Sequence, residues 1–263
     1  MTIYLIALGA ILLVGALAWV VSILIEDVSF VDSLWSLFFL LAAVLFAADA
    51  GFLSPRGTLV LALVVVWSLR LSIYITARNW GQPEDHRYQK IRENHEPGFV
   101  VKSLYIVFGL QGVLAWIIAA PLLPAIQSRS DLGMLDALAF VLVVVGLFFE
   151  AVGDWQLSRF KADPENRGRV LDSGLWRYTR HPNYFGEFCI WWGFWLFAVS
   201  AGAWWTLFSP ILMTILLLRV SGVAMLESSI GERRPAYAEY VRRTNAFFPG
   251  PRRASHEKEA HSS

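Results

Sequence analysis

Residues 3–25 read IYLIALGAILLVGALAWVVSILI, an apolar run without a charge that ends at Glu26 and Asp27. A helix rises 1.5 Å per residue, so about 20 apolar residues cross the roughly 30 Å hydrocarbon core of a bilayer. Signal peptides begin with basic residues and have apolar cores of only about 7–15 residues, whereas this run is longer and no Lys or Arg precedes it. We therefore expect residues 3–25 to form a retained transmembrane helix.

Six further apolar runs are candidate spans, and the sixth span of the chain is short. They cover residues 30–48, 58–77, 104–123, 135–155, 184–199 and 204–218. The 263 residues are 56% hydrophobic and 16% charged, against about 25% charged residues in soluble domains. The sequence predicts an all-α, multi-pass transmembrane helix bundle of about seven spans. We expect a single membrane domain over residues 1–250, with loops at 78–102 and 157–183 and a disordered tail at 251–263.

The basic residues are distributed unevenly. Of the 22 Lys and Arg residues, 19 follow an odd-numbered span, and Arg56, Arg70 and Arg129 are the exceptions. Because cytoplasmic loops are enriched in Lys and Arg, this pattern predicts an N-terminus outside and a C-terminus inside. We expect an integral protein of a bacterial inner membrane whose basic face lies in the cytoplasm.

The segment before the sixth span, residues 174–187, reads GLWRYTRHPNYFGE. Pro182 suits the first turn of a helix, where its missing N–H is not needed. The free N–H groups of that turn, together with Arg180 and His181, form a suitable place for a phosphate. Anchoring of a helix end in anionic headgroups is the alternative interpretation.

Two pairs of polar residues have a spacing of i, i+4. Asn183 and Glu187 share one helical face, and a carboxylate at that depth is expected to point into the bundle. Glu150 and Asp154 lie at the inner end of the fifth span, where two close carboxylates need cations or hydroxyl donors nearby. Ribose hydroxyls could supply those donors, and pairing with neighbouring basic residues is equally consistent with the spacing.

The third span carries a polar stripe of Arg70, Tyr74 and Arg78. An arginine inside a span is by default a candidate functional residue, with Asp32, Glu187 or an anionic ligand as the expected partner. A buried ion pair that only fixes packing is the alternative. Asp32, near the start of the second span, could donate a proton or could neutralise Arg70.

Other features are less specific. Residues 231–240, GERRPAYAEY, predict an amphipathic helix at the inner surface, either a cover for a cofactor or a membrane anchor. The five His residues are scattered and Cys189 is the only cysteine, so we expect no metal site and no intrachain disulfide. The basic loops follow from topology, and we expect neither nucleic acid nor an obligate protein partner.

In these residues the sequence resembles the steroid 5α-reductase-like membrane family, and within it a bacterial branch labelled DUF1295. The most specific matches are RHPNYFGE at 180–187 and YAEY at 237–240. The resemblance implies a seven-span reductase that binds NADPH from the cytoplasm. It also implies a cofactor lined by Arg70, Tyr74, Arg78, Glu150, Asp154, Arg169, Asn183 and Glu187, to which we add Arg180, His181 and Tyr184.

The resemblance further implies the reaction, reduction of a carbon–carbon double bond conjugated to a carbonyl in a membrane lipid or lipid-like molecule. Asp32 and Tyr74 are the candidate catalytic acids. Trp67 stands where the steroid enzymes carry a tyrosine, which weighs against a steroid enone as substrate. The alternative is a methyltransferase that uses S-adenosylmethionine, because isoprenylcysteine and phospholipid methyltransferases share a related Arg-His-Pro motif. A non-enzymatic lipid-binding or transport protein is the third hypothesis.

Overall fold

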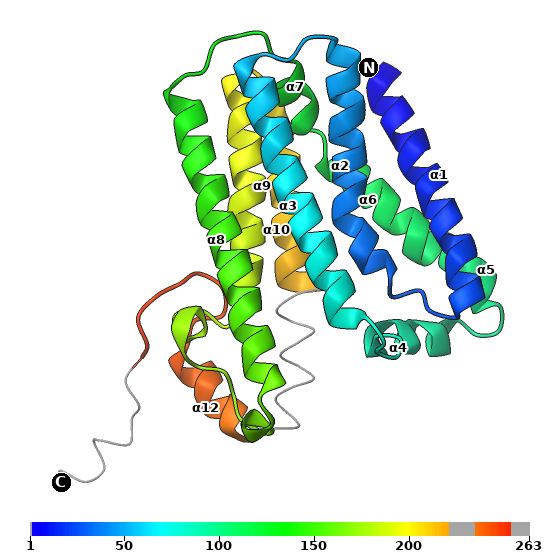
Figure 1. The fold of residues 1–263 in the computed structure, drawn as a ribbon, viewed down its shortest axis with the longest axis vertical. Coiled ribbons are helices and arrows are strands. Elements are labelled where there is room, and N and C mark those ends of the chain that lie inside the picture. The colour runs from blue at the N-terminus through cyan, green and yellow to red at the C-terminus, as the bar shows by residue number, and fades with distance from the viewer. Residues whose placement is uncertain (1, 221–234, 254–263) are drawn as a thin grey trace. The chain divides into compact units, whose positions relative to one another are not determined.

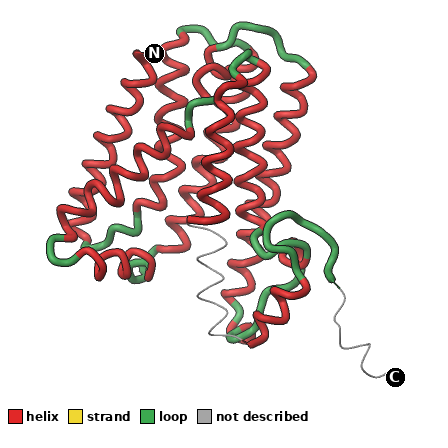
Figure 2. The backbone as a smooth tube through the Cα atoms, turned by 180° about the vertical axis from the view of Figure 1, so that it is seen from behind, coloured by secondary structure: helices red, strands yellow, loops and turns green. Residues whose placement is uncertain are grey.

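The computed structural model describes residues 2–220 and 235–253, and these ranges contain helices and loops but no strand (Figure 2). The long helices are α1 (Thr2–Ile25), α2 (Val31–Ala50), α3 (Pro55–Asn79), α8 (Met134–Ala162) and α9 (Pro182–Ser200). The shorter ones are α4 (His86–His95), α5 (Phe99–Ser103), α6 (Leu110–Ile118), α7 (Leu122–Gln127), α10 (Phe208–Ile215) and α12 (Pro235–Arg243). The predicted all-α fold is confirmed. The first part of the 231–240 motif and most of the predicted tail lie outside the described residues.

Five helical stretches of the described ranges are long and apolar enough to cross a membrane. They are Thr2–Ile25, Val31–Ala50, Pro55–Asn79, Phe99–Ile118 and Met134–Ala162. The predicted sixth and seventh spans correspond to α9 and to the shorter apolar stretch Trp204–Arg219. The chain is therefore consistent with an integral membrane protein, while the count of seven spans and their orientation stay predictions.

Several boundaries differ from the sequence prediction; α8, for example, continues to Ala162, past the predicted end at residue 155 and into the predicted loop 157–183. The fourth predicted span, 104–123, begins earlier, at Phe99, and its helix ends at Ile118. Pro121 accounts for the early end, because proline has no N–H to continue the helical hydrogen bonds. The predicted loop 78–102 also contains a helix, α4, whose first turn is capped by the Asp85 carboxylate accepting from the Arg87 N–H.

The chain divides into two compact units. One comprises Met1–Ala137 with Phe194–Ser209, and the other comprises Leu138–Gly193 with Pro210–Ser263. Within the first unit, α2 contacts α1, α3, α6 and α7 (Figure 1). Its core includes large aromatic side chains such as Phe39 and Trp67, whose rings lie 5.5 Å apart.

A buried ion pair ties three helix ends of the first unit together. Arg56, at the start of α3, donates from Nε to Asp136 Oδ1 at 2.7 Å and from Nη2 to Asp136 Oδ2 at 2.9 Å. Both residues are nearly inaccessible, with 1% and 2% exposure. Arg56 also donates to Ser200 Oγ at the end of α9 and to Ser128 Oγ in the loop before α8. Burial of two charges is tolerated only with such complete pairing.

Helices α8 and α9 pack closely in the second unit because glycines face each other. A Cβ placed on Gly186 would lie 2.5 Å from the carbonyl oxygen of Gly146, and one on Gly193 would lie 2.5 Å from Val143. Gly153 faces Pro182, so the order of contacts runs antiparallel. Small residues let helix backbones approach closely in membranes. The opposite face of α8 exposes apolar side chains, including Val141, Val144, Val145, Phe148 and Trp155, as expected beside lipid.

Candidate functional site

The buried face of α8 carries two carboxylates. Glu150 and Asp154 follow Gly146 at intervals of four residues and are only 2% and 4% exposed. A Cβ on Gly186 would contact the Glu150 side chain, which places that acid against α9. The Asn183 amide donates to Asp154 Oδ1 at 3.4 Å. The predicted pairs of α8 and α9 are thus brought together within the second unit.

The start of α9 stabilises this acidic face. α9 begins at Pro182, and Gly153 on α8 lies directly against that proline. The N-terminus of a helix carries a partial positive charge that favours nearby carboxylates. Arg180, buried just before the helix, adds a positive charge. The N-terminus of α9, which the sequence predicts to bind a phosphate, therefore already lies beside the carboxylates of Glu150 and Asp154.

Glu187 is buried one turn further along α9, as the spacing predicted. Its Oε1 accepts a hydrogen bond from Trp191 Nε1 at 3.0 Å, and the Trp191 indole is fully buried. Tyr184, on the same first turns, stacks on His181 with ring centroids 5.5 Å apart and nearly parallel planes. Arg169, by contrast, is exposed in the connection between α8 and α9. Of the predicted cofactor residues in this unit, Glu150, Asp154, Asn183 and Glu187 thus lie in one neighbourhood. Arg169 lies at the surface of the unit.

The Arg-His-Pro-Asn motif holds the C-terminal segment. The Arg180 guanidinium donates through Nη1 to the carbonyls of Val241, at 3.1 Å, and Thr244, and its backbone N–H donates to the carbonyl of Asn245. Thr179 Oγ1 donates to the carbonyl of Phe247 at 2.8 Å. Arg180 therefore positions the residues that follow α12.

A second contact reinforces this docking. Tyr240 on α12 donates its hydroxyl to the carbonyl of Trp176 at 2.6 Å, and Trp176 donates through Nε1 to the carbonyl of Gly153 on α8. Burial raises the pKa of Tyr240, so the phenol stays protonated as a donor at neutral pH. The described part of the GERRPAYAEY motif thus packs on the loop before α9.

The first unit holds the other predicted site residues. On α3 the guanidinium groups of Arg70 and Arg78 lie 5.5 Å and 5.9 Å from the centroid of the Tyr74 ring, within cation–π range. Arg78 Nε also donates to Asn79 Oδ1 at 3.0 Å. The predicted stripe of three residues is therefore present. The Tyr74 ring and the guanidinium groups of Arg70 and Arg78 form one cluster.

Asp32 lies in a network that the sequence did not reveal. Its Oδ1 accepts from the Tyr88 hydroxyl at 2.5 Å, and its Oδ2 accepts from Arg87 Nη2 at 2.7 Å. Gln111 donates through Nε2 to the Tyr88 oxygen at 2.9 Å. Burial, and then the negative charge of Asp32, raise the pKa of Tyr88. Arg87 and Tyr88 lie in a predicted loop, 55 and 56 residues from Asp32, where no local pattern indicates the pairing.

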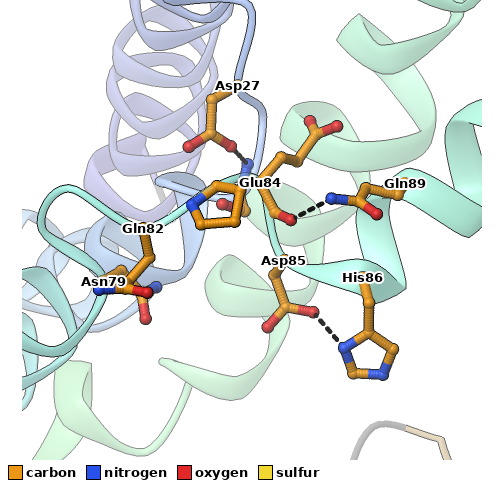
Figure 3. Close-up of a pocket in the computed structure, with 9 residues that line it drawn as sticks. Asp27, Asn79, Gln82, Glu84, Asp85, His86 and Gln89 are labelled. Carbon is orange, nitrogen blue, oxygen red and sulfur yellow. Dashed lines mark hydrogen bonds and ion pairs between the residues drawn. The ribbon is translucent and has the colours of Figure 1, made fainter.

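A polar cavity of about 330 Å³ adjoins this network (Figure 3). Its wall includes Asp27, Glu84 and Asp85, but each carboxylate already has a partner within the first unit. Asp27 accepts from the Ser29 N–H, Glu84 is paired with Arg92 at 2.8 Å, and Asp85 is paired with Arg87 at 3.0 Å. Burial opposes ionisation of Asp85, but the hydrogen bonds and charge of Arg87 outweigh it and lower the Asp85 pKa. Arg87 thus links the cavity wall to Asp32.

The predicted site residues therefore form two groups, one within each unit. Within residues 2–220 and 235–253, no three His, Cys, Asp or Glu side chains are grouped as metal ligands. The model of a family described as "Protein of unknown function (DUF1295)" matches residues 18–244 of this sequence. The chain belongs to the DUF1295 family.

This DUF1295 protein is also similar to an "Uncharacterized protein C594.04c" of the fission yeast Schizosaccharomyces pombe. The two sequences are 26% identical over 272 aligned positions, which cover 90% of this chain and 77% of the yeast protein. No solved structure matches the chain. The range matched by the family model includes both groups of predicted site residues.

Proposed function

We propose that this DUF1295 protein is a membrane-embedded reductase that uses NADPH to reduce a conjugated carbon–carbon double bond in a lipid or steroid-like substrate. The observation that carries the proposal is the set of buried ionisable side chains at the start of α9. Its members are Glu150, Asp154, Arg180, His181 and Glu187. Ionisable groups within membrane segments are costly and are by default functional candidates. Anchoring of one helix end in headgroups would need exposed cations rather than three buried acids.

The chemistry of this set fits a phosphorylated dinucleotide. Carboxylates such as Glu150 and Asp154 accept hydrogen bonds from ribose hydroxyls, and the Asn183 amide can both donate and accept. Arginine complements phosphate oxygens through charge-assisted hydrogen bonds. In the proposal, Glu150, Asp154, Asn183 and Glu187 hold the nucleoside parts.

When bound, NADPH would supply the hydride that the β-carbon of the conjugated system accepts. Negative charge then develops on the carbonyl oxygen of the substrate, and a hydrogen-bond donor at that oxygen lowers the barrier. In the proposal, the Tyr88 hydroxyl, which donates to Asp32 Oδ1 at 2.5 Å, and Asp32 act together as the donor to that oxygen. Arg87 Nη2 donates to Asp32 Oδ2 and Gln111 Nε2 donates to the Tyr88 oxygen, so both side chains are held in place. Tyr74 is the second candidate acid.

A binding experiment separates this proposal from the methyltransferase alternative. Detergent-purified protein is heated with NADPH or with S-adenosylmethionine, and the unfolding temperature is measured. A ligand at about 100 times its Kd stabilises the folded state by roughly 2.7 kcal/mol. We expect NADPH to raise the unfolding temperature and S-adenosylmethionine to leave it unchanged. Stabilisation by the methyl donor alone would refute the reductase, and stabilisation by neither would favour a non-enzymatic protein.

Variants then locate the site. Glu187→Gln keeps the size of the side chain and its contact with Trp191 but removes the charge, so it should weaken NADPH binding. Glu165→Gln, on the exposed connection between α8 and α9, is the matched control and should have no effect. Equal NADPH affinity in both variants would mean that Glu187 is outside the site.

A further inference from the structure

The helix α4 lies across the ends of the long helices of the first unit (Figure 1). It has 10 residues, and a glycine with a left-handed backbone lies on each side of it, Gly81 with a φ of +71° and Gly98 with a φ of +91°. An added Cβ at either glycine would meet nothing within 4 Å, so neither glycine serves close packing. Pro83 and Pro97 lie near these glycines and cannot continue a helix. The two junctions therefore have the composition of hinges.

α4 is attached to the rest of the unit chiefly by polar contacts. Tyr88 is its only buried residue, and it packs on an apolar cluster that includes Val31 and Phe99. Arg92 pairs with Glu84 at 2.8 Å, and water screens charges at such partly exposed positions. A helix of this length is also marginal without its tertiary contacts. Local opening of α4 is therefore expected to need much less free energy than unfolding of the long helices.

The first turn of α4 borders a cavity rather than packed side chains. The polar cavity of about 330 Å³ is lined there by His86 and Gln89, and by Gln82 and Glu84 of the preceding junction (Figure 3). This space lets the first turn move without displacing the apolar core of the unit.

α4 carries two of the groups that contact Asp32. Arg87 Nη2 donates to Asp32 Oδ2 at 2.7 Å, and the Tyr88 hydroxyl donates to Asp32 Oδ1 at 2.5 Å. Asp32 itself belongs to α2, and Gln111, which donates to the Tyr88 oxygen, belongs to α6. Movement of α4 away from α2 would thus remove both donors from Asp32 at once and uncover the start of α2.

We propose that α4 is a lid that opens about the junctions at residues 81–83 and 96–98 and controls access to Asp32. Closure assembles Asp32 with Arg87 and Tyr88, and opening separates them. The lid rests on the proposed function only for its consequence, because in a reductase closure would complete the donor to the substrate carbonyl and exclude water. The motion itself requires no particular ligand.

Thiol labelling tests for opening in the full-length, detergent-purified protein with Cys189 replaced by Ser. Val31→Cys places a thiol beneath α4, and Ile126→Cys places one near the end of α7, at the opposite end of the unit (Figure 1). Both native residues are 0% exposed, so a water-soluble maleimide reaches either thiol only after an opening. Arg87→Gln removes the lid's ion pair with α2, whereas Lys90→Gln removes a charge from the exposed side of the same helix.

The lid predicts faster labelling of Val31→Cys than of Ile126→Cys. Arg87→Gln should accelerate labelling of Val31→Cys about tenfold, as expected for the loss of a hydrogen bond between charged groups, and Lys90→Gln should not. A rate at Val31→Cys that Arg87→Gln leaves unchanged would show that α4 is a fixed strap and overturn the lid. Equal acceleration at Ile126→Cys would show general unfolding and overturn it as well.

Hydrogen exchange, followed by mass spectrometry, decides if Val31→Cys does not fold. In the otherwise native sequence, Arg87→Gln should accelerate exchange at residues 92–95 as much as at residues 89–91, because a lid opens as one unit. Acceleration confined to the first turns would mean fraying of the helix and would overturn the proposal. Arg92→Gln, which breaks the pair with Glu84, is the substitute if Arg87→Gln does not fold. Failure of NADPH to bind would refute the proposed function and leave both measurements of the lid intact.

Discussion

Removal of one partner of the buried Arg56–Asp136 pair should destabilise the protein far more than removal of both. Arg56→Met leaves the Asp136 carboxylate 2% exposed and without its guanidinium, which donates to both of its oxygens. Breaking a buried ion pair from one side typically costs about 3–5 kcal/mol. Replacing both charges with apolar residues is often neutral or stabilising, so Arg56→Met with Asp136→Leu should recover most of the loss.

Apparent unfolding temperatures in one detergent, followed by tryptophan fluorescence, provide the assay. Arg129→Met is the control, because Arg129 lies exposed in the loop that precedes α8 and should change stability by less than about 0.5 kcal/mol. We expect the control to be the most stable protein, the double variant to come next and the single variant to be the least stable. A double variant as unstable as the single one would show that the hydrogen bonds to Ser128 and Ser200, rather than an uncompensated charge, dominate this cluster.

Three further predictions follow from packing, titration and topology. Gly186→Val should prevent the close approach of α8 and α9 and lower the unfolding temperature, whereas Gly9→Val, where an added Cβ has nothing within 4 Å, should not. Because the folded-state pKa of Asp85 is lowered, its ion pair should stabilise fully above about pH 4 and be lost as the pH falls further. Unfolding temperatures of Asp85→Asn and wild type should therefore converge in acid, and a constant difference would contradict this. With Cys189→Ser, an impermeant maleimide should label Arg169→Cys only from the cytoplasmic side, and labelling from outside would reverse the predicted orientation.

The positions of the helices could be predicted because the signal for a span is local. The run at residues 3–25 became α1, Thr2–Ile25, and the predicted run 30–48 became α2, Val31–Ala50. Whether an apolar run can span a bilayer depends only on the length and composition of that run. The end of the fourth span at Ile118 also has a local cause, because Pro121 has no N–H to continue the helical hydrogen bonds.

Contacts between distant segments could not be predicted in the same way. The pairing of Asp32 with Tyr88 joins residues 56 positions apart, and Tyr88 lies in a segment assigned to a loop. Gly146 and Gly186 each look like an ordinary helical glycine until the two helices are aligned antiparallel. In both cases the contact depends on two segments that are distant in the sequence, so neither segment alone predicts it.

Arg180 shows how a motif can be identified from sequence while its immediate role differs from the predicted one. The sequence assigns it to phosphate binding because a cation precedes a helix N-terminus. In the structure its Nη1 donates to the carbonyl of Val241, in the last turn of α12, and to that of Thr244, which follows the helix. These contacts hold the C-terminal segment on the loop before α9. Arg180→Gln should therefore release that segment, and its proteolysis should be faster than in the wild type; an unchanged rate would show that the contacts of Thr179 and Tyr240 are sufficient.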